Sequence, residues 1–86
     1  MNYNRNLEYI FNHYGANNQA TQLIQECAEL IVALTKNNGD NIIEEMADVS
    51  VLIEQFMTAY PELKSKINHI KTYKVERQML HIMQHK

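Results

Sequence analysis

The sequence has few of the residues that break helices and form tight turns. It contains two glycines and one proline in 86 residues. Because these two residue types interrupt secondary structure most strongly, their scarcity favours a few long helices over many short strands. Cysteine is scarce as well. Cys27 stands alone, which excludes an internal disulfide, suits a reducing cytoplasmic location, and predicts a small buried apolar side chain.

A basic excess and long hydrophobic runs are also missing. Eight Lys and Arg stand against ten Asp and Glu, for a net charge of −2, so we expect no nucleic-acid polymer as a partner. No run approaches the roughly 20 apolar residues of a membrane span. Residues 1–6 contain no apolar export segment, so we expect no membrane association.

The length of the chain predicts a single domain over residues 1–86. A domain of this size buries only about 60–65% of the surface that its unfolded chain exposes, so its core is thin. Oligomerisation is a common remedy for so thin a core.

The apolar residues recur with helical spacing along most of the chain. In the first helix this spacing predicts one buried face made of Leu7, Ile10, Phe11 and Tyr14. Gly15 should end that helix, and Asn41, with Glu44 three residues later, should cap the third. The sequence therefore predicts an all-α fold, an antiparallel four-helix unit with helices over 4–14, 17–36, 41–60 and from 61 onward.

One internal repeat links the second and third helices. Residues 25–34 align with residues 44–53 at a constant offset of 19. Two similar helices joined by a short turn should pack antiparallel, related by a local two-fold axis. We expect the second helix to pack through an apolar seam of Ala20, Leu23, Ile24, Cys27, Leu30, Ile31 and Leu34.

Two pairs of acids flank this expected seam at matching positions of the repeat. Glu26 and Glu29 share one face of the second helix, and Glu45 and Asp48 repeat the spacing on the third. Either pair alone is common on a solvated helix face. Folding the hairpin at its turn brings the pairs level, where four carboxylates repel unless cations bind. Oxygen ligands without His or Cys favour Mg²⁺, with Mn²⁺ as a substitute, and no Glu-x-x-His pattern supports a di-iron site.

The last helix has basic residues on one side and apolar residues on another. Lys74 and Arg77 continue the stripe of Leu63, Ile67 and Ile70, and folding about Tyr60 brings Lys74 level with Met46. The two cations then either hold phosphate oxygens or neutralise the acids, and spacing alone leaves both interpretations open. The remaining apolar face should meet another subunit; it consists of Val75, Met79, Ile82 and Met83.

Taken together, the spacing resembles the metal-binding signature of the MazG-like all-α nucleoside triphosphate pyrophosphohydrolases. The resemblance covers roughly residues 15–77 and includes a Lys-x-x-Arg at Lys74 and Arg77. Two positions depart from the family pattern: Gln25 replaces a frequent Glu, and Thr72 stands near the place of a frequent Asn.

The resemblance implies the roles of the site residues. Mg²⁺ would be bound by Glu26, Glu29, Glu45 and Asp48, with Glu26 or Glu29 as general base. Lys74 and Arg77 would contact the triphosphate, and Gln19 and Gln22 would touch the nucleotide. The expected reaction converts an NTP or dNTP to the monophosphate and pyrophosphate, including the removal of non-standard nucleotides. Members of the family typically assemble as dimers or dimers of dimers, so the resemblance also implies a homodimer or a homotetramer. The alternative is a helical module that binds a nucleotide or a protein without turnover.

Overall fold

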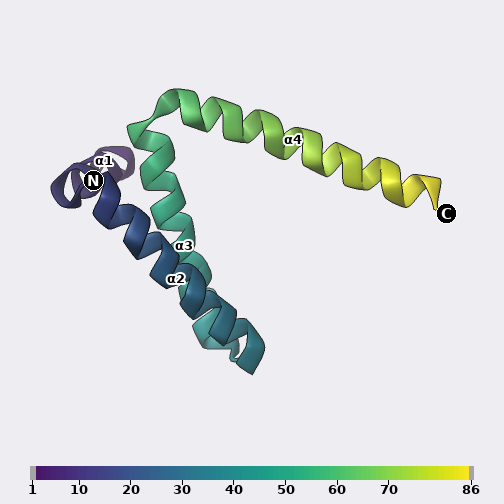
Figure 1. The fold of residues 1–86 in the computed structure, drawn as a ribbon, viewed down its shortest axis with the longest axis horizontal. Coiled ribbons are helices and arrows are strands. Elements are labelled where there is room, and N and C mark those ends of the chain that lie inside the picture. The colour runs from purple at the N-terminus through teal and green to yellow at the C-terminus, as the bar shows by residue number, and fades with distance from the viewer. Residues whose placement is uncertain (1, 86) are drawn as a thin grey trace.

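The protein, described here by a computed structural model over residues 2–85, contains four α-helices and no strand within that range. Short turns join the helices in sequence order (Figure 1). None of the described helices has the length and hydropathy needed to cross a membrane. The expected all-α class is confirmed, with α1 at Tyr3–Tyr14, α2 at Ala16–Lys36, α3 at Gly39–Ala59 and α4 at Pro61–Gln84.

Helices α2 and α3 form the antiparallel hairpin that the repeat predicts (Figure 1). On each helix one row of buried and half-buried positions recurs in steps of three and four, as in two helices that pack along one seam. On α2 this row is Gln19, Leu23, Glu26, Leu30 and Ala33, and on α3 it is Ile42, Glu45, Val49, Leu52 and Phe56. The second half of α3 is covered on further sides as well, and Gln55 is buried there.

Of the seam residues expected from the sequence, only Leu23 and Leu30 lie in this seam. Ile24 and Ile31 are 70% and 64% exposed, and Cys27 is exposed as well. Helix α2 is instead rotated so that Glu26 lies within the contact with α3. The physical reason is that α2 has apolar residues around more than half of its circumference, so periodicity alone leaves its rotation undetermined.

Helix α1 closes the end of the hairpin that lies near Tyr60. Phe11 packs edge-to-face against Phe56 at 5.0 Å and against Tyr60 at 5.7 Å between ring centroids. The hydroxyl of Tyr3 donates a 2.6 Å hydrogen bond to Glu54, which ties α1 to α3. Leu7 and Phe11 are buried as expected, whereas Ile10 and Tyr14 are 37% and 56% exposed.

The helix ends follow local chemistry. Gly15 ends α1 and precedes α2 with a φ of 89°, which an L side chain rarely adopts. Asn37 has left-handed geometry, and the side chain of Asn38 accepts a hydrogen bond from the backbone N–H of Asn41. Asn38 is therefore the cap of α3, rather than Asn41, because the helix begins two residues earlier than the sequence indicated.

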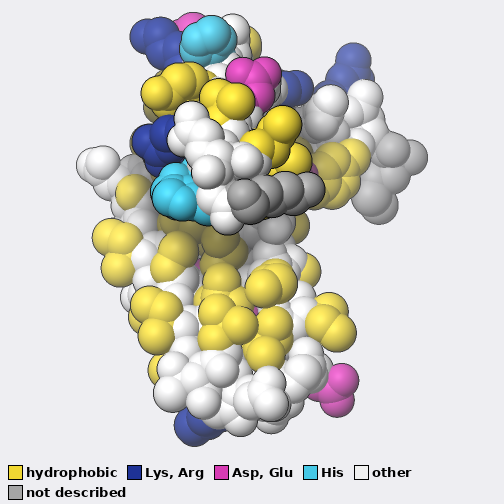
Figure 2. All heavy atoms as spheres, turned by 90° about the vertical axis from the view of Figure 1, so that its right-hand side faces the viewer, with side chains coloured by type: hydrophobic (Ala, Val, Ile, Leu, Met, Phe, Trp, Pro, Cys, Tyr) yellow, Lys and Arg dark blue, Asp and Glu magenta, His cyan; other side chains and the backbone are white. Residues whose placement is uncertain are grey.

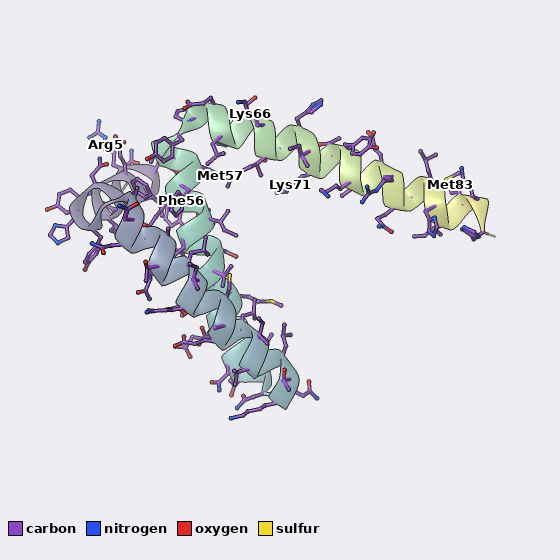
Figure 3. The ribbon with its side chains drawn as sticks, in the orientation of Figure 1. Arg5, Phe56, Met57, Lys66, Lys71 and Met83 are labelled. Atoms are coloured by element: carbon purple, nitrogen blue, oxygen red, sulfur yellow. The ribbon has the colours of Figure 1, made fainter. Side chains whose placement is uncertain are left out.

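Helix α4 leaves the body of the molecule. It contacts only α3 among the described helices and extends away from the hairpin beyond the turn at Tyr60 (Figures 1 and 3). In Figure 3, Lys66, Lys71 and Met83 follow one another along this projecting helix, and Met83 at its end lies far from Phe56 and Met57 on α3. This corrects the expectation that α4 folds back along α3 and brings Lys74 level with Met46. None of its residues is buried.

Candidate active site

The site is built on the seam between α2 and α3. Glu26, Glu29 and Glu45 each place a carboxylate oxygen within 4.8 Å of the others. They come together because Glu26 and Glu45 occupy seam positions, with Glu29 one turn further along α2. Asp48, one turn beyond Glu45, lies at the margin of this group and interacts electrostatically with Glu26. The hairpin thus brings the four predicted acids to one region.

Two carboxylate oxygens at the centre of the site are buried without a hydrogen-bond partner. They are one oxygen of Glu26 and one oxygen of Glu45. A buried acceptor without a donor is costly, and a buried charge without a counter-charge costs more. These two atoms therefore mark a place where a positively charged group fits.

The electrostatics of the group point the same way. The pKa of Glu45 is raised to about 7, first by loss of solvent and then by hydrogen bonding to Glu26 and the negative charges of Glu29 and Glu26. The pKa of Glu29 is also raised, chiefly by its hydrogen bond with Glu26, although hydrogen bonding to Glu45 acts in the opposite direction. Loss of solvent and the charge of Glu26 raise the pKa of Asp48. Each shift arises without a neighbouring cation.

The residues present fit a hard divalent cation. The group supplies only carboxylate oxygens, which Mg²⁺ and Mn²⁺ prefer, and Cys27 lies outside it on an exposed position of α2. The buried oxygens of Glu26 and Glu45 need a positive partner, and the convergent charges repel one another without one. On this chemistry Glu26, Glu29 and Glu45 would hold the ion, with Asp48 completing the set.

The two predicted glutamines have different positions. Gln22 donates a 2.9 Å hydrogen bond from its amide nitrogen to the second oxygen of Glu26, and so orients that carboxylate. Gln19 is buried in the seam, where its amide nitrogen donates to the side-chain oxygen of Gln55 at 2.7 Å. Gln19 therefore joins the two helices, and its contact with a nucleotide stays a prediction.

Lys74 and Arg77 are not brought to the acids within one chain. Both are exposed on the part of α4 that projects from the body, and Arg77 lies over the ring of Tyr73 at 6.0 Å from its centroid. The sequence places them correctly on one helix face, but the direction of α4 separates that face from the hairpin (Figure 3). The phosphate contacts of these two residues remain a prediction.

A hollow beside the acids contains residues that the sequence analysis missed. It has a volume of about 350 Å³ and extends from Glu29 and Glu45 toward the α2–α3 turn. Lys36 lies two turns beyond Glu29, and Asn41 lies one turn before Glu45, so helical spacing from the acids was the signal that could have identified them. The remaining lining residues are Ala28, Val32, Ala33 and Asn38.

Comparison with known proteins gives one match. Searches of curated proteins and of solved structures yield no significant similarity. The model of the MazG nucleotide pyrophosphohydrolase domain matches residues 15–78, which include all of α2 and α3 with the four acids, and α4 through Lys74 and Arg77. Since that match covers most of the chain, the protein belongs to the MazG nucleotide pyrophosphohydrolase domain family.

Proposed function

We propose that this protein hydrolyses a nucleoside or deoxynucleoside triphosphate to the monophosphate and pyrophosphate, with Mg²⁺ at the acids of the hairpin. The observation that carries the proposal is the convergence of Glu26, Glu29 and Glu45, two of which have a buried oxygen without a partner. Repelling carboxylates with unpartnered buried oxygens lower the stability of the fold. Such destabilising arrangements are typical of functional sites. When bound, Mg²⁺ would neutralise phosphate charge and lower the pKa of a water molecule.

The other steps of the reaction are assigned to side chains of this chain. Gln22 holds Glu26 in place through its hydrogen bond. Glu29 is the exposed member of the three convergent acids, so water reaches it, and we assign it as the general base. Water adds to the α-phosphorus, its proton passes to Glu29, and the bond to the bridging oxygen breaks as pyrophosphate leaves. Lys74 and Arg77 would contact the phosphate oxygens, which gain charge in this step.

The direct test is a panel of NTPs and dNTPs incubated with Mg²⁺ and assayed for both products. We expect monophosphate and pyrophosphate in equal amounts, and no release when Mg²⁺ is chelated. Release of inorganic phosphate alone would contradict the proposed bond cleavage. Nucleotide binding without either product would favour the non-catalytic module.

Substitutions on α4 test the phosphate contacts. Loss of a charge-assisted hydrogen bond to phosphate typically costs about 1.5–3 kcal/mol, so Lys74→Ala or Arg77→Ala should lower kcat/KM roughly ten- to a hundredfold. Lys64→Ala, which removes a cation of the same helix ten residues before Lys74, is the control and should retain activity. If kcat/KM stays within about twofold of wild type in both site variants, the phosphate role is refuted.

A further inference from the structure

The hollow beside the acids has two chemically different ends. Its volume is about 350 Å³, and Glu29 and Glu45 line the end next to the other acids. The opposite end, at the α2–α3 turn, is lined by Lys36, Asn38 and Asn41. In Figure 2 polar side chains and backbone, in white, gather at this turn end of the hairpin, at the bottom of the view, with hydrophobic side chains above them. The hollow thus runs from the place proposed for the reaction to a small group of hydrogen-bonding side chains.

The wall between the two ends is apolar. It is formed by Ala28, Val32 and Ala33 of α2, of which Ala33 is buried and Val32 is about half exposed. Two of these three residues are alanines, whose small side chains leave space in front of the helix. Apolar walls with a few polar groups at one end are typical of sites that bind small organic molecules. A nucleobase, with apolar faces and a polar edge, matches this chemistry.

A polyphosphate matches the turn end of the hollow less well. The end of α2 carries a partial negative charge and the start of α3 a partial positive charge, so the two largely cancel where the helices meet. Lys36 is the one cation among the described residues that line the hollow, and the acid Asp40 lies in the first turn of α3. One lysine beside an acid leaves most of the charge of a triphosphate unbalanced, whereas a neutral base needs no counter-charge.

A second hollow, with a volume of about 500 Å³, lies at the other end of α2, where Tyr14 lines it. The described residues that line this second hollow include none of the four acids. Two of its amide side chains are already engaged, Gln19 with Gln55 and Gln22 with Glu26. The hollow at the turn is therefore the better site for a base, because two of the acids line it directly.

The spacing along the helices leaves room for a nucleotide. Lys36 is seven residues beyond Glu29, which is about 10 Å along α2 at 1.5 Å per residue. Asn41 is four residues before Glu45, or about 6 Å along α3. With a phosphate at the acids and a base at the turn end, the sugar fits between them, beside the apolar wall.

From these observations we infer that the turn end of the hollow binds the nucleobase of the substrate, with Lys36 and Asn41 at its hydrogen-bonding edge. An ammonium group only donates hydrogen bonds, whereas an amide both donates and accepts them. Uracil, thymine and guanine have a keto oxygen where cytosine and adenine have an amino group. Lys36 therefore selects the triphosphates of keto bases. This inference rests on the proposed function for the role of the acids, and it adds the substrate class.

Binding of nucleoside monophosphates tests base selection without turnover. Titration calorimetry with Mg²⁺ present compares UMP and GMP with CMP and AMP, each also in its deoxy form, and with pyrophosphate. We expect the keto nucleotides to bind about tenfold more tightly, the usual effect of one hydrogen bond from a charged donor. Lys36→Met, which keeps the length of the side chain without its charge, should remove this preference and leave pyrophosphate binding unchanged. Lys64→Met on α4 is the matched control and should keep the preference.

Two results of the calorimetry would overturn the inference. One is a wild type that binds none of the monophosphates or binds the keto and amino nucleotides equally. The other is a Lys36→Met variant that binds pyrophosphate and all the monophosphates more weakly by the same factor, because Lys36 would then contact phosphate. The melting temperature of each variant verifies that it remains folded.

The position of the base is tested by photo-cross-linking. In 4-thiouridine monophosphate a photoreactive sulfur replaces the keto oxygen that Lys36 is inferred to contact. After irradiation with Mg²⁺ present, fragmentation mass spectrometry locates the modified residue. We expect modification within residues 28–41 and its suppression by excess UMP. Modification within residues 14–25 would place the base in the second hollow and refute the assignment.

Turnover separates this inference from the proposed function. In an active protein, Lys36→Met should lower kcat/KM for the keto triphosphates about tenfold and leave the amino triphosphates within about twofold of wild type. Hydrolysis without any preference between bases would overturn the inference and leave the proposed function intact. Base-selective binding and modification within residues 28–41, in a protein that releases no pyrophosphate, would refute the proposed function and leave the base site intact.

Discussion

At the scale of single residues, Glu45 shows most clearly where function and stability oppose each other. It occupies a seam position between α2 and α3 that a leucine would fill in a purely structural hairpin. Its buried oxygen has no partner, and loss of solvent, followed by the nearby carboxylates of Glu26 and Glu29, raises its pKa. The residue therefore weakens the hairpin in the absence of a cation.

Replacing the carboxylate of Glu45 should separate its contribution to activity from its cost to stability. We expect Glu45→Gln to reduce pyrophosphate release by about a hundredfold or more, since even residues that only support a metal ligand typically contribute ten- to a hundredfold. The melting temperature without Mg²⁺ should rise, because the variant removes one of the repelling charges. Glu44→Gln, a neighbouring acid outside the convergent group, is the control and should change neither property greatly. Near-normal activity of Glu45→Gln would refute its place in the site.

The pH dependence of stability follows from the same residue. The pKa of Glu45 is about 7 in the folded protein, against an ordinary value of 4.5 for a glutamate without these interactions. The folded state therefore binds a proton more tightly than the unfolded chain does. Stability is then fully present below about pH 4.5 and is lost as the pH rises through about 7. The melting temperature of the metal-free protein should fall over this window, more steeply in the wild type than in Glu45→Gln. Parallel pH profiles of the two proteins would contradict the assignment.

At the scale of the helices, the cap of α3 fixes where the hairpin turns. Asn38, and not Asn41, accepts the hydrogen bond that begins this helix. Removal of an Asn cap typically costs about 1 kcal/mol, so Asn38→Ala should lower the free energy of unfolding by that amount in chemical denaturation. Asn41→Ala, within the helix, is the matched control and should be nearly neutral. The opposite order would indicate that α3 begins where the sequence pattern suggested.

At the scale of the whole molecule, the chain buries little apolar surface. Only Leu7, Phe11, Ala33 and Leu52 are buried hydrophobic residues among those described. Val75, Met79, Ile82 and Met83 on α4 are each more than half exposed. We therefore expect association to contribute to the stability of a chain with so small a core.

Association makes stability depend on concentration. We expect the melting temperature of the wild type to rise with protein concentration, since the folded state is favoured by mass action when it pairs. Met79→Glu should lower the melting temperature and shift the assembly toward monomer, because it places a charge among the apolar side chains of α4. Scanning calorimetry at several concentrations provides the measurement, and Glu76→Gln on the same helix is the control. A concentration-independent transition would argue against an obligate assembly.

The sequence by itself determined the features that depend on local spacing. The four helices, the turn between α2 and α3, and the convergence of Glu26, Glu29 and Glu45 all follow from residues three, four and nineteen positions apart. Such spacing fixes which side chains share a helix face, because the α-helix has a constant rotation per residue. The length of the turn then fixes which faces meet at the same height.

Only the tertiary structure decided how each helix is rotated and where α4 points. Helix α2 is apolar on several sides, so its packing against α3 was settled by the fit of both helices, which placed Glu26 in the seam and left Ile24 and Ile31 exposed. The direction of α4 depends on the backbone at Tyr60, where φ is −127° and ψ is 86°. A change in these two dihedral angles would swing the whole of α4, and with it Lys74 and Arg77. The periodic spacing of residues in the sequence does not predict such angles.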